Sequence, residues 1–302
     1  MSKMEKVQLT PNGPCFSPLV QGYWRMDSWG MSPAERLSFL QSHMDLGITT
    51  VDHAHVYGNP SCETLFGEAL KLAPAVRNQI EIVTKCGIEL PNAAEGKVAH
   101  YLSDAKSIER SLDLSLARLG VEHVDVLLLH RPDLLMDADE VAEAFSRLKN
   151  AGKVLHFGVS NFLPSQFSLL QSRLDAPLVT NQVEINPINL SVTEDGSLDF
   201  LQQQRVIPMA WSCLGGGRIF GEDSESMLRL RQTLELVKEE LSADSVDQVL
   251  YAWVMNLPTN PIPIIGSGKI TRIASAIKSL DLSLTQEQWY RIWTASKGHG
   301  VA

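Results

Sequence analysis

The 302-residue chain has little of several features that mark particular classes of protein. Its four cysteines are scattered, with no CxxC pair and no histidine at the spacing of a zinc ligand. We therefore interpret Cys15, Cys62, Cys86 and Cys213 as free thiols and expect no bound metal. The longest aliphatic runs have four or five residues, far short of the ~20 that a membrane-spanning helix needs.

Basic charge is also scarce, because 26 Lys and Arg stand against 35 Asp and Glu and the formal net charge is -9. This balance argues against sequence-independent binding to nucleic acid and against attachment to anionic membranes. The first residues, MSKMEKVQLT, lack the apolar core of a signal peptide. We therefore expect a cytoplasmic protein with no nucleic-acid or membrane partner, either a monomer or a weak homo-oligomer.

Short aliphatic runs do alternate with amphipathic stretches along the chain, which is typical of βαβ units and a parallel sheet. Eight runs predict strands, at 18–22, 48–52, 80–85, 124–129, 154–159, 179–183, 206–210 and 262–265. Eight stretches predict helices, at 32–46, 61–72, 107–119, 138–149, 164–172, 198–204, 226–241 and 271–280. No linker rich in Pro or Ser divides the chain. The pattern predicts an α/β protein, a single (β/α)8 TIM barrel domain over residues 1–302.

Three segments fall outside the eight repeats. Residues 7–16, with Pro11-Asn12-Gly13 in the middle, predict an N-terminal β-hairpin that plugs the floor of the barrel. Residues 245–255 predict an extra helix, and residues 285–296 predict a C-terminal helix that opens with a capping box. A doubly wound sheet would also fit the alternation, but its usual sign is GxGxxG after the first strand. That strand ends instead in Gly-Tyr-Trp-Arg at 22–25.

Polar side chains follow most of the predicted strands, at the end where such barrels carry their chemistry. Asp52 ends the second strand and Tyr57 follows it, Lys85 ends the third, and His130 follows the fourth. Each has an ordinary interpretation when taken singly. Asp52 could cap a helix or a turn, Tyr57 and His130 could be packing residues, and Lys85 could be a solvated lysine. Together, however, Asp, Lys and His at three consecutive strand ends converge on one pocket.

This combination suits the donation of a proton to a carbonyl group. A free tyrosine has a pKa near ~10, and a neighbouring lysine cation lowers it because it favours the phenolate. We therefore predict Tyr57 as the general acid, Lys85 as the group that tunes it, and Asp52 as the partner of Lys85. His130 would hold and polarise the carbonyl oxygen. A hydride must come from a cofactor, since no side chain carries one.

The chain closely resembles the aldo-keto reductases, nearest to a bacterial branch of cytosolic oxidoreductases. The resemblance rests on Asp-x-Ala-x-x-Tyr-Gly at 52–58, Asp-Val-Leu-Leu-Leu-His at 125–130, Gly-Val-Ser-Asn-Phe at 158–162 and Asn-Gln-Val-Glu at 181–184. It runs from about Gly22 to Ile277. It implies an enzyme that reduces an aldehyde or a ketone to an alcohol with NADPH.

The resemblance also implies which residues bind NADP(H). By matching motif positions, Ser160, Asn161 and Gln182 would hold the nicotinamide carboxamide, and Trp211 would stack on the nicotinamide ring. Other implied cofactor contacts are Gly22, Trp24, Ser212, Leu214, Gly266, Ser267, Lys269 and Arg272.

Within that set, Ser212 and Leu214 would line the pyrophosphate, and residues 264–272 would hold the adenosine 2′-phosphate. Glycines, a serine, a lysine and an arginine at the start of a helix can cradle a phosphate on physical grounds as well. Two positions depart from the family pattern. Gly266 stands where many members have lysine, and Ala276 stands where many have asparagine. These departures either weaken the implied cofactor binding or relax the implied preference for NADP, which Lys269 and Arg272 still favour.

The substrate itself is not specified by these side chains. We predict that Tyr23, Trp24, His53, Tyr57 and His130 shape its pocket. Two other functions stay open. A class I aldolase would also use a barrel lysine, as a Schiff-base nucleophile, but would not need the set of residues that holds the nicotinamide. A non-enzymatic cofactor-binding subunit would keep the fold and NADP, although nothing in the sequence marks a partner surface.

Overall fold

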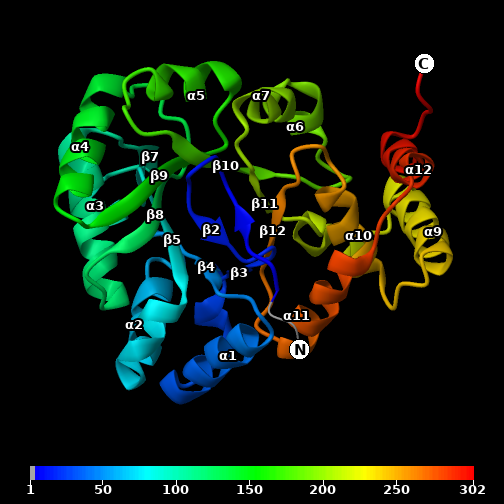
Figure 1. The fold of residues 1–302 in the computed structure, drawn as a ribbon, viewed down its shortest axis with the longest axis horizontal. Helices are drawn as coiled ribbons and strands as arrows, with labels where there is room; N and C mark the ends of the chain where they lie inside the picture. The colour runs from blue at the N-terminus through cyan, green and yellow to red at the C-terminus, as the bar shows by residue number, and fades with distance from the viewer. Residues whose placement is uncertain (1–3) are drawn as a thin grey trace.

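The computed structural model describes residues 4–302, and eight parallel strands in it close into a barrel in the order β10-β11-β12-β3-β4-β5-β8-β9 (Figure 1). The first three residues of the predicted domain lie outside the described residues. Every predicted strand is present, so the barrel fold is confirmed. The strands are β3 (Val20–Gly22), β4 (Thr50–Asp52), β5 (Glu81–Cys86), β8 (Val124–Leu129), β9 (Val154–Ser160), β10 (Leu178–Glu184), β11 (Met209–Trp211) and β12 (Ile262–Ile265).

The eight predicted helices surround this barrel. Ser32 and Glu35 form the expected capping box before the first, with Pro33 at its first turn, because each side chain accepts a backbone N–H of the other. Gly120 ends the third in the left-handed conformation, at φ 68°. The helices are α1 (Pro33–Asp45), α2 (Cys62–Leu72), α3 (Ala105–Leu119), α4 (Ala138–Asn150), α5 (Pro164–Gln171), α7 (Ser197–Gln204), α9 (Glu225–Glu240) and α11 (Ile270–Ile277).

The predicted N-terminal hairpin consists of β1 (Val7–Gln8) and β2 (Cys15–Phe16), and it lies across the ring of strands (Figure 1). Leu9 and Phe16 are fully buried in one apolar cluster with inward-facing strand residues such as Val83 and Leu128. Burying such side chains is favourable because it removes apolar surface from water. The hairpin therefore closes the N-terminal end of the barrel and leaves the C-terminal end of the strands as its mouth.

Two further helices, α10 (Val246–Met255) and α12 (Gln286–Lys297), confirm the predicted additions near the C-terminus. Figure 1 shows α12 alongside α9 at the edge of the molecule. The indole rings of Trp253 and Trp289 stack with centroids 4.7 Å apart and planes 6° apart. Each indole N–H donates to the other residue's carbonyl oxygen, at 3.1 Å and 3.0 Å. This reciprocal contact joins α10 to α12.

Several short elements were not predicted. A second hairpin, β6 (Ile88–Glu89) and β7 (His100–Tyr101), follows β5. The others are α6 (Ser191–Glu194), α8 (Arg218–Gly221) and five 3₁₀ turns, η1 (Met26–Trp29), η2 (Pro74–Gln79), η3 (Ala93–Glu95), η4 (Gly215–Gly217) and η5 (Lys278–Asp281). Most of them lie in the loops that leave the mouth of the barrel. Across residues 4–302, no helix is both long enough and apolar enough to cross a bilayer.

Candidate active site

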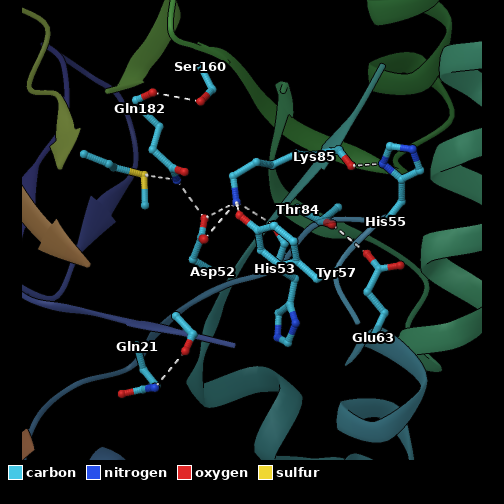
Figure 2. A network of polar contacts seen from close by, with 12 residues as sticks. Gln21, Asp52, His53, His55, Tyr57, Glu63, Thr84, Lys85, Ser160 and Gln182 are labelled. Carbon is cyan, nitrogen blue, oxygen red and sulfur yellow. Dashed lines mark hydrogen bonds and ion pairs between the residues drawn. The ribbon is translucent and has the colours of Figure 1, made fainter. Parts of the chain in front are cut away.

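Asp52 and Lys85 form a buried ion pair at the ends of the neighbouring strands β4 and β5. The Lys85 ammonium donates to both Asp52 carboxylate oxygens at 2.8 Å and to the backbone oxygen of His53 at 2.7 Å (Figure 2). Lys85 is fully buried and Asp52 is 3% exposed. A buried charge is tolerated only when it is paired and hydrogen-bonded, and all three Lys85 donors have acceptors near them.

Tyr57 reaches this pair because the chain turns tightly after β4, where the Tyr57 N–H donates to Ala54 O at 3.1 Å. Lys85 Nζ then lies 2.9 Å from the Tyr57 hydroxyl oxygen (Figure 2). His130 packs edge-on against the Tyr57 ring, with centroids 5.7 Å apart. Its Nδ1 is buried and has no hydrogen-bond partner in the described part of the chain. The structure therefore brings together the four residues predicted to form one pocket.

The charge state of Lys85 is set by two opposing effects. Burial lowers the pKa of its ammonium, but the charges of Asp52 and Tyr57 outweigh burial, and the net direction is upward. Lys85 is therefore a cation at neutral pH. Burial, together with the charge of Lys85, lowers the pKa of His130 well below its usual range. His130 is therefore neutral, with one N–H donor.

The sequence predicted only that Lys85 lowers the pKa of Tyr57, and the structure corrects the net direction. Burial of the hydroxyl is the largest effect and raises the pKa, Lys85 opposes it, and Asp52 adds to it. The net pKa lies above the ordinary value. Tyr57 therefore carries its proton at neutral pH, which leaves it available as a donor.

The residues predicted to hold the nicotinamide form a hydrogen-bonded chain that leads away from Asp52. Gln182 donates from Nε2 to Asp52 Oδ1 at 2.7 Å, and the Gln182 backbone oxygen accepts from Ser160 Oγ at 2.8 Å (Figure 2). Asn161 donates to Ser160 Oγ at 2.8 Å and accepts from Trp211 Nε1 at 3.1 Å. The ring of Trp211 is thereby fixed at the mouth, where it is only partly buried.

Two other predicted cofactor residues, Ser212 and Leu214, lie partly buried in the loop that follows β11. The backbone oxygen of Ser212 accepts from Asn186 Nδ2 at 3.0 Å. Ser212 has a positive φ of 53°, and Gly215 to Gly217 also have positive φ angles. Only glycine adopts such angles without strain, so the run of glycines gives this loop its sharp turn beside Trp211.

The segment between β12 and α11 carries the residues predicted to bind a phosphate. Lys269 and Arg272 are exposed, and neither forms an ion pair with any residue from 4 to 302. Ser267 Oγ accepts from the Lys269 N–H at 3.2 Å, but no side chain among residues 4–302 caps the first turn of α11. A Cβ atom on Gly268 would lie 2.6 Å from the Trp29 ring, which explains the glycine. Unsatisfied backbone N–H groups beside two free cations suit a phosphate group.

Gly22 and Trp24 come from the loop after β3, beside this segment. A Cβ atom on Gly22 would lie 2.8 Å from the Ile264 side chain, and one on Gly266 would lie 3.2 Å from Trp24 Nε1. The Trp24 ring is 48% exposed. These glycines therefore allow the two loops to approach closely, and Gln21 Nε2 links them through a 3.1 Å bond to the oxygen of Ser267.

Two predicted substrate contacts are corrected by the structure. Tyr23 and His53 are fully buried between the barrel and helices α1 and α2, and their rings stack on each other with centroids 5.0 Å apart. Alternate residues of a strand face opposite sides. Because Asp52 faces into the barrel, His53 faces outward and packs against Phe66 of α2. Neither ring can line a pocket at the mouth.

A second layer behind Lys85 was not predicted. One ring nitrogen of His55 lies 2.7 Å from Lys85 O (Figure 2), and the other lies 2.6 Å from Ile88 O. Arg118 of α3 donates to His55 O at 3.1 Å. This layer fixes the backbone that carries Lys85. The available signal was the position of His55, two residues before Tyr57 in the motif.

Glu63 of α2 is the other buried member of this layer. It accepts from Thr84 Oγ1 at 2.6 Å (Figure 2), while Arg118 lies 3.7 Å away, beyond hydrogen-bond length. Burial raises the pKa of its carboxyl group, against the effects of Thr84 and Arg118. Within residues 4–302, no group of three His, Cys, Asp or Glu could hold a metal ion, and all four cysteines are free.

The barrel and its polar mouth define an oxidoreductase of a known class. A sequence model of the Aldo/keto reductase family matches residues 18–297, and the chain belongs to this family. It is 54% identical to oxidoreductase YdhF of Escherichia coli over 298 residues, which cover 99% of each chain. Membership in an oxidoreductase family gives no support to the aldolase alternative.

Two further similarities extend the comparison. The chain is 40% identical to a protein of Agrobacterium fabrum named 6-dehydroglucose reductase, over 95% of this chain and 96% of that one. The structure of the present chain is similar to the crystal structure of a thermostable aldo-keto reductase, Tm1743, in complex with the inhibitor epalrestat. The TM-score is 0.80 at 25% identity, and the match covers 97% of this chain and 100% of the other.

Proposed function

We propose that this protein reduces aldehyde or ketone carbonyls to alcohols with NADPH, and that Tyr57 is the general acid. It would act as one barrel domain, a monomer or a weak homo-oligomer. The observation that carries the proposal is the 2.9 Å contact between Lys85 Nζ and the Tyr57 hydroxyl, backed by the buried Asp52 carboxylate. A protonated tyrosine beside a fixed cation suits the donation of a proton to a developing alkoxide.

The residues at the mouth fit a nicotinamide cofactor. When bound, NADPH would supply the hydride that no side chain can provide. Ser160, Asn161 and Gln182 have amide and hydroxyl groups suited to its carboxamide, and Trp211 has a ring face to stack on. Lys269 and Arg272, which form no ion pair within residues 4–302, favour the 2′-phosphate of NADP over the 2′-hydroxyl of NAD.

The proton step follows from the contacts of Tyr57. Its O–H bond breaks as a new O–H bond forms on the carbonyl oxygen, and negative charge develops on the phenol oxygen. Lys85, at 2.9 Å, stabilises that charge, and Asp52 keeps the ammonium group aimed at it. Neutral His130, beside the Tyr57 ring, would donate its N–H to the same carbonyl oxygen and hold it in place.

The variant Tyr57→Phe tests the proposal, because it removes the hydroxyl group that would donate the proton and keeps the aromatic ring. We expect kcat to fall by at least ~10²-fold, the scale of general acid catalysis. NADPH affinity, measured by fluorescence titration, should stay within about 3-fold, since the cofactor residues are untouched. Tyr101→Phe, in the exposed β7 strand, is the matched control. Full activity of Tyr57→Phe on a panel of carbonyls would contradict the assignment.

A further inference from the structure

Arg131 is a partly buried cation at the mouth of the barrel that the proton step does not use. It follows His130 directly, and its guanidinium carbon lies 5.5 Å from the centre of the Trp211 ring. No carboxylate or carbonyl group from residue 4 to residue 302 accepts a hydrogen bond from it. By contrast, Arg36 and Arg77, which are also mostly buried, are both paired with carboxylates. The donors of Arg131 therefore lack a fixed partner.

Arg131 lines a polar cleft of about 220 Å³ beside Trp211. Glu184 lies in the same cleft and is in register with Trp211 on the neighbouring strand. It is two residues beyond Gln182, on the side of β10 that faces the barrel axis. Its carboxylate accepts from Asn186 and Asn189 at 3.0 Å and 2.8 Å, which fixes its orientation. Asn161, Asn189, Ser191, Asp195 and Ser197 are the other polar residues of the lining, so the cleft holds a second carboxylate.

The cleft lies at the same mouth of the barrel as Tyr57 and His130, although neither of these residues lines it. Arg131 is bonded in sequence to His130, and Asn161 connects the cleft to Trp211 through its 3.1 Å hydrogen bond. The charge of Arg131 lowers the pKa of Tyr57, although burial raises it by more. A substrate whose carbonyl oxygen meets Tyr57 would therefore place its neighbouring carbon atoms within reach of the cleft.

The mixture of charges selects among ligand classes. An anionic substrate would meet the fixed carboxylate of Glu184 and that of Asp195. An apolar substrate would remove water from Arg131 and Glu184 without replacing their hydrogen bonds, which is unfavourable. A hydroxyl group both donates and accepts, so it can bond to Glu184 and Arg131 together.

We propose that Arg131 and Glu184 form a subsite for the hydroxyl groups of a neutral polyhydroxylated carbonyl substrate, which makes Arg131 a specificity-determining residue. This inference rests on the proposed reductase function. It places the hydroxyl groups on the carbon atoms next to the carbonyl group.

The test compares two three-carbon aldehydes, D-glyceraldehyde and propanal, which differ in their hydroxyl groups. We would measure kcat/KM for both with saturating NADPH in the wild type, Arg131→Met, Glu184→Gln and the control Arg205→Met, which lies at the exposed end of α7. Arg131→Met should lower the glyceraldehyde-to-propanal ratio by about 10-fold or more, the effect of losing a hydrogen bond to a charged group. Glu184→Gln keeps an acceptor and should lower the ratio less. The control should leave it unchanged.

The other outcomes separate the two proposals. An unchanged ratio in Arg131→Met, or wild-type enzyme that reduces propanal but not glyceraldehyde, overturns the subsite alone. A larger loss with succinic semialdehyde than with glyceraldehyde would identify an anion site and also overturn it. If NADPH affinity in Arg131→Met weakens by the same factor as kcat/KM, Arg131 acts on the cofactor instead, and the subsite is overturned. If neither aldehyde nor any carbonyl on the panel is reduced, the reductase proposal fails and the subsite with it.

Discussion

The buried cluster around Lys85 and the exposed segment from Gly266 to Arg272 treat charge in opposite ways. Lys85 and Asp52 are almost without exposure, and their charges are satisfied by other groups of the chain. Lys269 and Arg272 are exposed, and the described chain offers them no ion-pair partner. One region is complete before any ligand arrives, while the other has unused binding capacity.

The difference indicates that the buried cluster is arranged to stabilise a transition state, whereas the exposed segment is arranged to bind a ligand. A buried cluster that is already oriented needs little reorganisation when charge develops near it, which is how preorganised sites stabilise a transition state. Free cations on a surface contribute almost nothing to folding, but they strengthen the binding of an anion. Stability and ligand affinity should therefore respond separately to substitutions in the two regions.

The largest effect is expected in the buried cluster, for Lys85→Met. The substitution leaves the Asp52 carboxylate buried with Gln182 as its remaining side-chain donor. Removing one partner of a buried ion pair lowers the free energy of unfolding by ~3–5 kcal/mol, and activity should fall with it. Urea unfolding measures the first and NADPH oxidation the second. Lys153→Met, which removes an exposed pair with Asp113, should change stability by no more than ~1 kcal/mol. Equal losses of unfolding free energy in Lys85→Met and Lys153→Met would contradict the difference drawn between buried and exposed charges.

An intermediate effect is expected in the exposed segment, for the double variant Lys269→Met/Arg272→Met. Its stability should stay within about 0.5 kcal/mol of the wild type, as for surface sites without partners. Its NADPH dissociation constant should rise by about 10-fold or more, because charge-assisted hydrogen bonds to the 2′-phosphate are lost. Urea unfolding measures the stability, and isothermal titration with NADPH and with NADH measures the two dissociation constants. A parallel rise for NADH would show that the two cations do not read the 2′-phosphate.

The smallest effect sharpens the comparison within the buried region, at Glu63. Burial raises the pKa of Glu63 in the folded state, so the folded protein holds this proton more tightly than the unfolded chain does. The contribution of Glu63 to the free energy of unfolding is therefore complete below the ordinary pKa of about 4.3. It is lost as the pH rises through the pKa that Glu63 has in the folded protein. Glu63→Gln cannot ionise and still offers Thr84 an acceptor.

The free energy of unfolding of Glu63→Gln should thus decline less with rising pH than that of the wild type. Urea titrations at several pH values from 4 upward check this, with Glu140→Gln on the exposed face of α4 as the control. A pH dependence identical to that of the wild type would mean that the Glu63 carboxyl group is not perturbed by its burial.

The barrel and the four-residue pocket could be predicted from the sequence because both follow from local patterns. Aliphatic runs locate the strands, and a parallel barrel brings all their C-terminal ends together. The same reasoning does not say which way a side chain points after a strand ends. Tyr23 and His53 were therefore predicted at the mouth, although the two-residue period that turns Asp52 inward turns His53 outward.

Other features depend on contacts between segments far apart in the sequence. The β6–β7 hairpin pairs two-residue strands across a long loop. Strands of two residues are too short to show a periodic pattern in the sequence. The bond from Gln182 to Asp52 joins residues 130 positions apart. The upward shift in the pKa of Tyr57 reflects burial, which the identity of its neighbours does not reveal. Arg131 follows a predicted site residue, but only the structure shows it over Trp211, with no polar partner among the described residues.

The stacked indoles of Trp253 and Trp289 also have an optical consequence. Two chromophores held 4.7 Å apart and nearly parallel share their excited states, and the coupling disappears when they separate. Four other tryptophans are present in the chain, at 24, 29, 211 and 293, but the paired signal belongs to the junction of α10 with α12. Circular dichroism can therefore follow the docking of the C-terminal helix in the unlabelled protein, separately from the melting of the barrel.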